Sequence, residues 1–287
     1  MAISQNSRSP VRHSIVLVAI PSLVVVAMGV IGVALYLRSA ADESDRNRIR
    51  GAEFYLLYYA RHYDHLPPAC LRDANGKPLS SWRFAAVMRA VTEIEAEPPL
   101  GWPTTEQAWN SNQNALLRNS FLHSESSQWA CYIDPTRPGG MARFAAITGP
   151  GTAFDEKAPC GIYADTSSST ARPTLVPPQT ILFVEIRNST KHWMEPGGDL
   201  DIRTMDHTVG RGTGNDPSGV YPEGFWVAFA DGRCWYLSND TPFDVLAKFF
   251  TIDSAKEYVR RKALGRYLRC EVTMTTTLLP ASPSEER

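Results

Sequence analysis

The chain has 287 residues, 43% of them hydrophobic, which is enough to bury one good core in a large domain or two small ones. Its 29 basic and 30 acidic residues give a formal net charge of -1. A chain without a strong positive field is not expected to collect nucleic acid or acidic substrates. The 5 cysteines form no Cys-x-x-Cys pair, which excludes a zinc ribbon and a thioredoxin-like motif and leaves disulfides and buried thiols open.

An uncharged apolar segment runs from Ile15 to Leu37, after a short tail of residues 1–14. Its 23 residues would reach about 34 Å as a helix, enough to cross the hydrocarbon core of a bilayer. The run is too long for a typical cleaved signal peptide and closes without a clear cleavage site. We therefore predict a single-pass transmembrane helix that is a signal anchor. Basic residues flank both ends, so the charges do not settle its orientation.

Residues 38–68 are predicted to form a helical stem that continues the membrane helix outward. No proline lies between Arg38 and His65, and a dense apolar set falls in the second half of this stretch. That half is expected to pack on a folded domain. Leu66-Pro67-Pro68 should end the helix, because proline removes a donor and restricts the residue before it.

Short apolar runs rich in β-branched and aromatic residues follow, separated by frequent Gly and Pro. The runs are Phe144–Ile147, Thr180–Ile186, Phe225–Phe229 and Cys234–Leu237. Their length and composition are typical of strands. The last two are joined through Asp231-Gly232, a strong hairpin-turn signal, so we predict an antiparallel sheet.

Two helical segments and a tail complete the chain. Residues 243–250 have one apolar face and predict a short helix against the sheet. Residues 254–268 predict a second helix, whose basic side chains are more typical of a solvated face than of a surface for anionic partners. We assign residues 69–270 to one exported domain and residues 271–287, rich in Thr, Ser, Pro and Glu, to a disordered tail.

Motifs with Pro, Gly and Trp at fixed places occur in order over residues 38–257. They are Tyr63–Pro68, Asp73–Arg83, Trp109–Asn112, Thr148–Phe154, Val184–Ile186 and His192–Pro196. Together they resemble the planctomycete-type family with domain of unknown function 1559, whose members look like prepilins or pseudopilins. The resemblance implies an α+β, pilin-like fold: a long N-terminal helix, transmembrane and then exported, packed on an antiparallel β-sheet with a short C-terminal helix. It also favours an inner (cytoplasmic) membrane location with the large domain outside the cytoplasm.

The resemblance assigns family-motif residues and shows two departures. The motif residues here are His192, Trp193, Glu195, Pro196, Tyr221, Asp231 and Gly232. The family signature is a His, nine residues and then Asp-Gly, and Tyr221 stands where the His would be, so a catalytic or metal role is not expected there. Prepilins also have a Gly cleavage point and a Glu early in the mature helix. Ser9–Ser14 has no such Gly and the following span has no Glu, so we expect no processing and less tendency to polymerise.

One polar set contains the residue types of a metal hydrolase. It consists of Glu185, His192, Glu195, Asp199, Asp201, Asp206 and His207. Its spacing matches neither His-Glu-x-x-His nor a calcium loop, and no nucleophile motif such as Gly-x-Ser-x-Gly is present. We therefore predict no catalytic residue, no cofactor-binding residue and no metal ligand. If a metal binds, the surplus of carboxylates favours Ca²⁺ over Zn²⁺.

These patterns favour a non-catalytic, membrane-anchored, pseudopilin-like envelope protein. It would be structural or part of a secretion- or pilus-type assembly, partnered with the membrane through one span and with other pilin-like proteins, in homo- or hetero-assembly. The alternative is a surface module that binds a glycan or peptide through exposed tryptophans and the acidic loop. The candidate tryptophans are Trp102, Trp109, Trp193, Trp226 and Trp235. A metal-dependent hydrolase is a third hypothesis.

Overall fold

The computed structural model describes residues 42–94, 103–120, 128–157, 160–162 and 174–274. The chain divides into two compact units, Met1–Arg46 and Asn47–Arg287. Residues 42–46, the described part of the first unit, are helical. The sheet and both hydrophobic cores lie within the second unit.

A helix over residues 47–63 opens the second unit. Its fully buried apolar residues are spaced by three or four positions and therefore share one face: Ile49, Ala52, Leu56 and Ala60. The helix ends before Leu66-Pro67-Pro68, which confirms the predicted stop. Asp64 closes it with a φ of 61°, in the left-handed region that often follows a helix.

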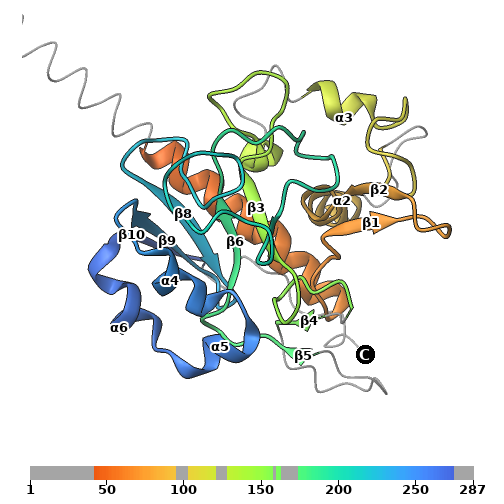
Figure 1. Ribbon diagram of the computed structural model, residues 1–287. Coiled ribbons are helices and arrows are strands. Elements are labelled where there is room, and N and C mark those ends of the chain that lie inside the picture. Colours follow the sequence, from red (N-terminus) through yellow and green to blue (C-terminus); the bar gives the residue numbers. More distant parts are fainter. Residues whose placement is uncertain (1–41, 95–102, 121–127, 158–159, 163–173, 275–287) are drawn as a thin grey trace, which may run out of the picture. The chain divides into compact units, whose positions relative to one another are not determined.

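A six-stranded sheet forms the centre of the unit (Figure 1). In spatial order its strands are β10 (Leu268–Thr273), β9 (Arg233–Ser238), β8 (Gly224–Phe229), β6 (Ile181–Glu185), β3 (Phe144–Thr148) and β7 (Leu200–Asp201). Neighbouring strands from β10 to β3 are antiparallel, whereas β7 pairs with β3 in parallel. Asp231-Gly232 lies in the tight connection between β8 and β9, and Gly232 has a φ of 77°, so the predicted hairpin is confirmed.

Shorter elements surround the sheet. They are β1 (Cys70–Arg72), β2 (Pro78–Ser81), α2 (Trp82–Ile94), α3 (Ala115–Ser120), β4 (Cys160–Gly161), β5 (Thr174–Leu175), α4 (Phe243–Leu246), α5 (Ile252–Glu257) and α6 (Arg260–Leu264), with 3-10 turns at Gln128–Tyr132, Ala247–Phe249 and Gly265–Tyr267. β1 and β2 form an antiparallel hairpin, and β4 and β5 a parallel pair. Figure 1 shows α4, α5 and α6 gathered beside the β8–β9–β10 end of the sheet.

Helices cover both faces of the sheet, and alternation along β8 shows why. Phe225, Val227 and Phe229 belong to a core that includes Leu246 of α4 and Leu264 of α6. The residues between them, Trp226 and Ala228, belong to a second core with the helix over 47–63 and α2. A strand buried on both faces reads as a continuous apolar run, as this one does.

The predicted fold class is wrong. The structure is a mixed α/β arrangement with a six-stranded mixed sheet, not a pilin-like packing of one long helix on an antiparallel sheet. The parallel strand β7 contains only Leu200 and Asp201, which is too short to give an apolar strand pattern. The helix over 47–63 and α2 pack on one face of this sheet, and α4 and α6 pack on the other.

The predicted membrane anchor also needs correction. The span Ile15–Leu37, the tail 1–14 and residues 38–41 of the stem lie outside the described residues. Among the residues that the structure does describe, no helix combines the length and apolarity needed to cross a bilayer. This contradicts the predicted transmembrane helix, the membrane as a partner and the inner-membrane location, and none of the three enters the function proposed below.

The local predictions had different outcomes. The four apolar runs lie in β3, β6, β8 and β9, so these strands are confirmed. The predicted helix over 254–268 is instead divided into α5 and α6 by Tyr258, which has extended φ and ψ of -119° and 145°. Strand β10 crosses the predicted domain boundary at residue 270, and residues 275–287 of the predicted tail lie outside the described residues.

A buried carboxyl joins the helix over 47–63 to the sheet. Glu53 is 0% exposed, and the thiol of Cys234 on β9 donates to its Oε2 over 2.8 Å. Its Oε1 has no hydrogen-bond partner among the described residues. Burial raises the pKa of Glu53 from 4.5 to about 8, with a further rise from Asp231 opposed by the Cys234 hydrogen bond and by Arg260. All 5 cysteines of the chain are free thiols, so of the alternatives left open the structure has thiols.

The Glu53 pKa predicts a pH-dependent free energy of unfolding. The folded protein keeps a proton that the unfolded chain releases above pH 4.5, so this stabilisation is complete below pH 4.5 and declines as the pH rises to about 8. The decline is at most about 1.4 kcal/mol per pH unit. Glu53→Gln should flatten it, as measured by urea unfolding across this pH range. Exposed Asp253→Asn serves as control, and an unchanged slope in Glu53→Gln would show that Glu53 does not titrate as described.

Candidate functional site

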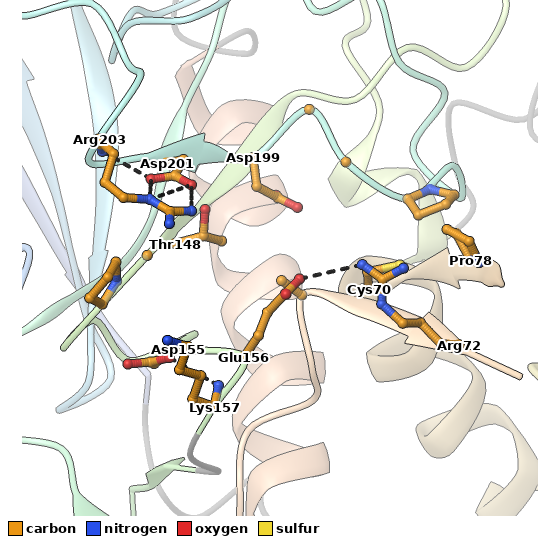
Figure 2. Close-up of a pocket in the computed structure, with 16 residues that line it drawn as sticks. Cys70, Arg72, Pro78, Thr148, Asp155, Glu156, Lys157, Asp199, Asp201 and Arg203 are labelled. Carbon is orange, nitrogen blue, oxygen red and sulfur yellow. Dashed lines mark hydrogen bonds and ion pairs between the residues drawn. The ribbon is translucent and has the colours of Figure 1, made fainter. Parts of the chain in front are cut away.

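An open pocket of about 440 Å³ lies between the β1–β2 hairpin, the turn that follows β3 and the loop that enters β7 (Figure 2). Its walls combine charged side chains with prolines and glycines. The charged residues are Arg72, Asp155, Glu156, Lys157, Asp199, Asp201 and Arg203. Of the described residues that line it, none has an aromatic side chain.

Asp199 lies at the inner wall of the pocket, and its side chain is 6% exposed. Three donors converge on its Oδ1 at 2.9 Å: the Trp82 indole Nε1–H, the Arg83 Nη1–H and the Ala146 backbone N–H. The Arg83 side chain is 0% exposed, so this is a buried ion pair. No hydrogen bond from a described residue reaches Oδ2, and in Figure 2 the carboxylate points across the pocket toward that of Glu156.

Backbone carbonyls complete the surroundings of Arg83. Its Nε donates to the Trp193 carbonyl over 3.0 Å, its Nη1 to the Phe144 carbonyl over 2.9 Å and its Nη2 to the Gly197 carbonyl over 3.0 Å. These acceptors come from β3 and from the loop of residues 193–197, and Arg83 itself comes from α2. One guanidinium therefore fixes three segments around the pocket.

Charges at the rim are paired with one another. Arg203 donates from Nε to both Asp201 oxygens, at 2.9 and 3.2 Å, and its Nη2 also contacts Oδ2. Arg72 lies 3.7 Å from Glu156, and their side chains are 45% and 63% exposed. Such an exposed, long pair contributes at most about 1 kcal/mol. The Arg72–Glu156 contact can therefore be broken, and Glu156 can accept another cation, at low cost in free energy.

Asp155 and Cys70, which also line the pocket, have shifted pKa values. Backbone N–H groups of Gly151 and Lys157 donate to Asp155 and lower the pKa of its carboxyl. Burial raises the pKa of the Cys70 thiol, although the charge of Arg72 opposes it. A raised thiol pKa leaves little thiolate at neutral pH, so Cys70 lacks the property of a catalytic nucleophile.

The motif His192–Pro196 forms a compact turn beside this pocket. His192 stacks on Trp109 with ring centroids 5.2 Å apart, and its Nδ1 accepts the Met194 N–H over 3.2 Å. Burial, helped by the charge of Arg118, lowers the pKa of His192 to about 4, so the ring is neutral at physiological pH. It has the chemistry of a packed core histidine.

The other motif residues contact the turn or the pocket wall. Trp193 is buried and its carbonyl accepts from Arg83, whereas Glu195 accepts from Lys191 over 2.6 Å. Pro196 lines the pocket. Tyr221 lies half-buried in the bend before β8. The structure thus brings His192, Trp193, Glu195 and Pro196 together, in one turn.

Asp231 and Gly232 belong to the β8–β9 turn. Both Asp231 oxygens accept from Arg260 of α6, at 3.0 and 2.7 Å. The Arg260 guanidinium also lies over the rings of Phe229 and Trp235, at 4.2 and 4.8 Å from their centroids. Arg260, expected on a solvated helix face, is in fact 8% exposed and holds α6 to the sheet.

The polar set considered for a metal hydrolase is spread over separate contacts. Glu185 pairs with Arg143 over 2.7 Å inside the sheet, and His207 stacks on Phe243. Asp206 accepts from the side chain of Asn215. Within the described ranges, no group of three or more His, Cys, Asp or Glu side chains has an arrangement that could hold a metal ion.

The tryptophans proposed for glycan capture are largely in the core. Trp193, Trp226 and Trp235 are at most 3% exposed, and Trp109 is half-buried against His192. Trp102 lies outside the described residues. Sugar recognition through a platform of these side chains therefore has no structural basis in the described part of the chain.

Sequence reasoning missed the residue that organises the site. Arg83 is the one charge in the apolar stretch Trp82–Met88, and a lone arginine in such a context signals a buried ion pair. Its partner Asp199 was in the polar set, but only as a candidate metal ligand. Their separation of 116 positions along the chain hid the pairing.

The chain matches no protein-family model, no curated protein and no solved structure. These comparisons do not test the resemblance to the family with domain of unknown function 1559. The assignment of a function therefore depends on the geometry of the site.

Removing the carboxylate of Asp199 should destabilise the fold strongly, because it leaves the buried Arg83 charge uncompensated. We expect Asp199→Ala to lower the free energy of unfolding by about 3–5 kcal/mol. Glu156→Ala removes an exposed carboxylate from the same pocket and should cost less than about 1 kcal/mol. Denaturant titration of both variants provides the measurement, and equal losses would contradict the central place given to the Arg83–Asp199 pair.

The Asp231–Arg260 contact is more accessible to solvent than the Arg83–Asp199 pair, since its side chains are 23% and 9% exposed. Asp231→Ala removes two charged hydrogen bonds and should lower the free energy of unfolding by about 2 kcal/mol. Asp253→Ala deletes an acid that is 95% exposed and should change it by less than about 0.5 kcal/mol. Thermal unfolding of the two variants compares them directly. A Tm for Asp231→Ala equal to that of the control would mean that the contact does not hold α6.

Proposed function

We propose that the protein is non-catalytic and acts within a protein assembly, where it binds a partner polypeptide through the pocket beside β7. This is the structural or assembly role, of secretion or pilus type, that the family resemblance implies. The observation that carries the proposal is the chemistry of the pocket. It combines an open, charged rim with prolines and glycines in the walls, while the buried acidic side chains and His192 have internal partners.

The internal contacts of those polar residues support a structural role. Glu185 accepts from Arg143 and from the backbone N–H groups of Val220 and Trp226, which uses both of its oxygens. Asp216 accepts from three successive N–H groups, those of Arg211, Gly212 and Thr213. Carboxylates saturated in this way shape loops, and they are poor general bases because their lone pairs are occupied.

The pocket itself suits a segment of polypeptide better than a planar cofactor or a sugar. Bases and sugars are commonly recognised by stacking on aromatic rings, and among the described residues none that lines the pocket supplies one. Prolines, glycines and paired charges instead offer apolar contact together with hydrogen bonds. Such groups are compatible with the polar, solvent-accessible rim of an interface with another protein.

Site-directed photo-crosslinking in the protein's own cells tests the proposal. A benzophenone amino acid replaces Lys157 at the pocket, and the matched control carries it in place of Lys256, an exposed lysine on α5. We expect a discrete crosslinked polypeptide from position 157 and none from position 256. The mass of the product distinguishes a second copy of the chain from a different protein.

Two results would contradict the proposal. One is the absence of any crosslinked product at position 157 across protein levels. The other is hydrolytic turnover by the purified protein that is lost when a pocket carboxylate is replaced, since that would make the pocket an active site.

A further inference from the structure

The apolar part of the pocket offers contact for an aliphatic chain. Four lining residues present hydrocarbon without a polar side-chain group: Ala69, Pro78, Pro150 and Pro196. Gly149, Gly197 and Gly198 add backbone without a side chain. A flexible methylene chain can lie along such a surface, as the stems of lysine and arginine do when their charged ends reach a polar partner.

Inside the pocket, the acceptor atom Oδ2 of Asp199 receives no hydrogen bond from a described residue. All three donors to Asp199 meet at its Oδ1, and no described residue donates to Oδ2. The side chain is 6% exposed and lines the pocket, so Oδ2 has little access to water except from that side. An acceptor that is open to the pocket in this way can accept an N–H from a ligand.

Glu156 supplies a second acceptor opposite Asp199. Figure 2 shows the two carboxylates on facing sides of the pocket, pointing toward one another. The contact of Glu156 with Arg72 is 3.7 Å long and exposed, so a ligand cation can replace Arg72 with little loss. The buried Arg83 and the rim residue Arg203 are held by Asp199 and Asp201 at shorter distances. Glu156 is therefore the carboxylate whose partner a ligand cation can replace.

We propose that this pocket binds the cationic side chain of a lysine or arginine presented by the partner polypeptide. The methylene stem would pack on the prolines, and the charged end would donate to Asp199 Oδ2 and to Glu156. The inference rests on the proposed function, because it names the chemistry by which that partner is recognised. Glu156 at the rim would then select a cationic side chain, and the ion pair with Arg83 would hold the Asp199 carboxylate in position.

Nuclear magnetic resonance titration of the full chain with Nα-acetyl-arginine amide and Nα-acetyl-lysine amide tests the inference. The neutral isostere Nα-acetyl-citrulline amide is the ligand control. We expect the cationic amides to shift the backbone N–H signals of Gly149, Gly151, Gly197 and Gly198, which lie in or next to the pocket, and citrulline amide to leave them unchanged. Glu156→Gln should weaken the binding about threefold to fivefold, while Asp253→Asn should leave it as it is.

Equal shifts from citrulline amide, shifts confined to residues away from the pocket, or full binding by Glu156→Gln would each overturn the inference. Crosslinking at position 157 separates this failure from that of the proposed function. If a crosslinked polypeptide forms but the cationic amides do not bind, the proposed recognition of a lysine or arginine is overturned and the assembly role stands. Absence of both results overturns the inference and the proposed function together.

Discussion

The buried ion pair of Arg83 and Asp199 is the constraint on which the rest of the site depends. Removing two charges from water is costly, and here the cost is offset because the guanidinium is also surrounded by backbone carbonyls and the carboxylate oxygen by three donors. The arrangement forces α2, the edge of β3 and the loop before β7 to meet at one point. The pocket exists because these segments converge there and leave Asp199 at its inner wall.

The same principle explains why charged residues recur in the interior. Arg143 with Glu185, and Arg260 with Asp231, each join elements that are distant in sequence, and each arginine lies in a place where an unpaired charge would be unfavourable. Such pairs add geometric specificity, because planar guanidinium groups accept only a few orientations. The helices on the two faces of the sheet are thereby held in defined positions, beyond what apolar packing requires.

The sequence allowed the strands to be predicted where their pattern was local. The apolar runs of β3, β6, β8 and β9, together with Asp231-Gly232, identified a hairpin and most of the central sheet. The sequence could not reveal β7, because a strand of two residues shows no alternation of apolar and polar positions. The pairing of Arg83 with Asp199 was also hidden, because the two residues lie far apart along the chain. The pilin-like fold failed for the same reason: a resemblance in ordered motifs constrains turns, whereas the topology depends on which distant segments pair. The polar set was identified as a candidate group for a metal hydrolase and rejected for its spacing, and the pairing of Glu185, Asp199 and Asp201 with arginines was not foreseen.

The contact between Glu53 and Cys234 allows the separation of the helix over 47–63 from the sheet to be followed at a native thiol. Cys234 is 1% exposed under the helix over 47–63, and burial raises the pKa of its thiol well above the ordinary range. A thiol in that state does not react with an alkylating reagent, because the thiolate is the reactive form. Each modification event at this position therefore records a moment when the helix has left the sheet. The rate of alkylation at Cys234, followed separately from that of the other four thiols, therefore reports the free energy of that separation.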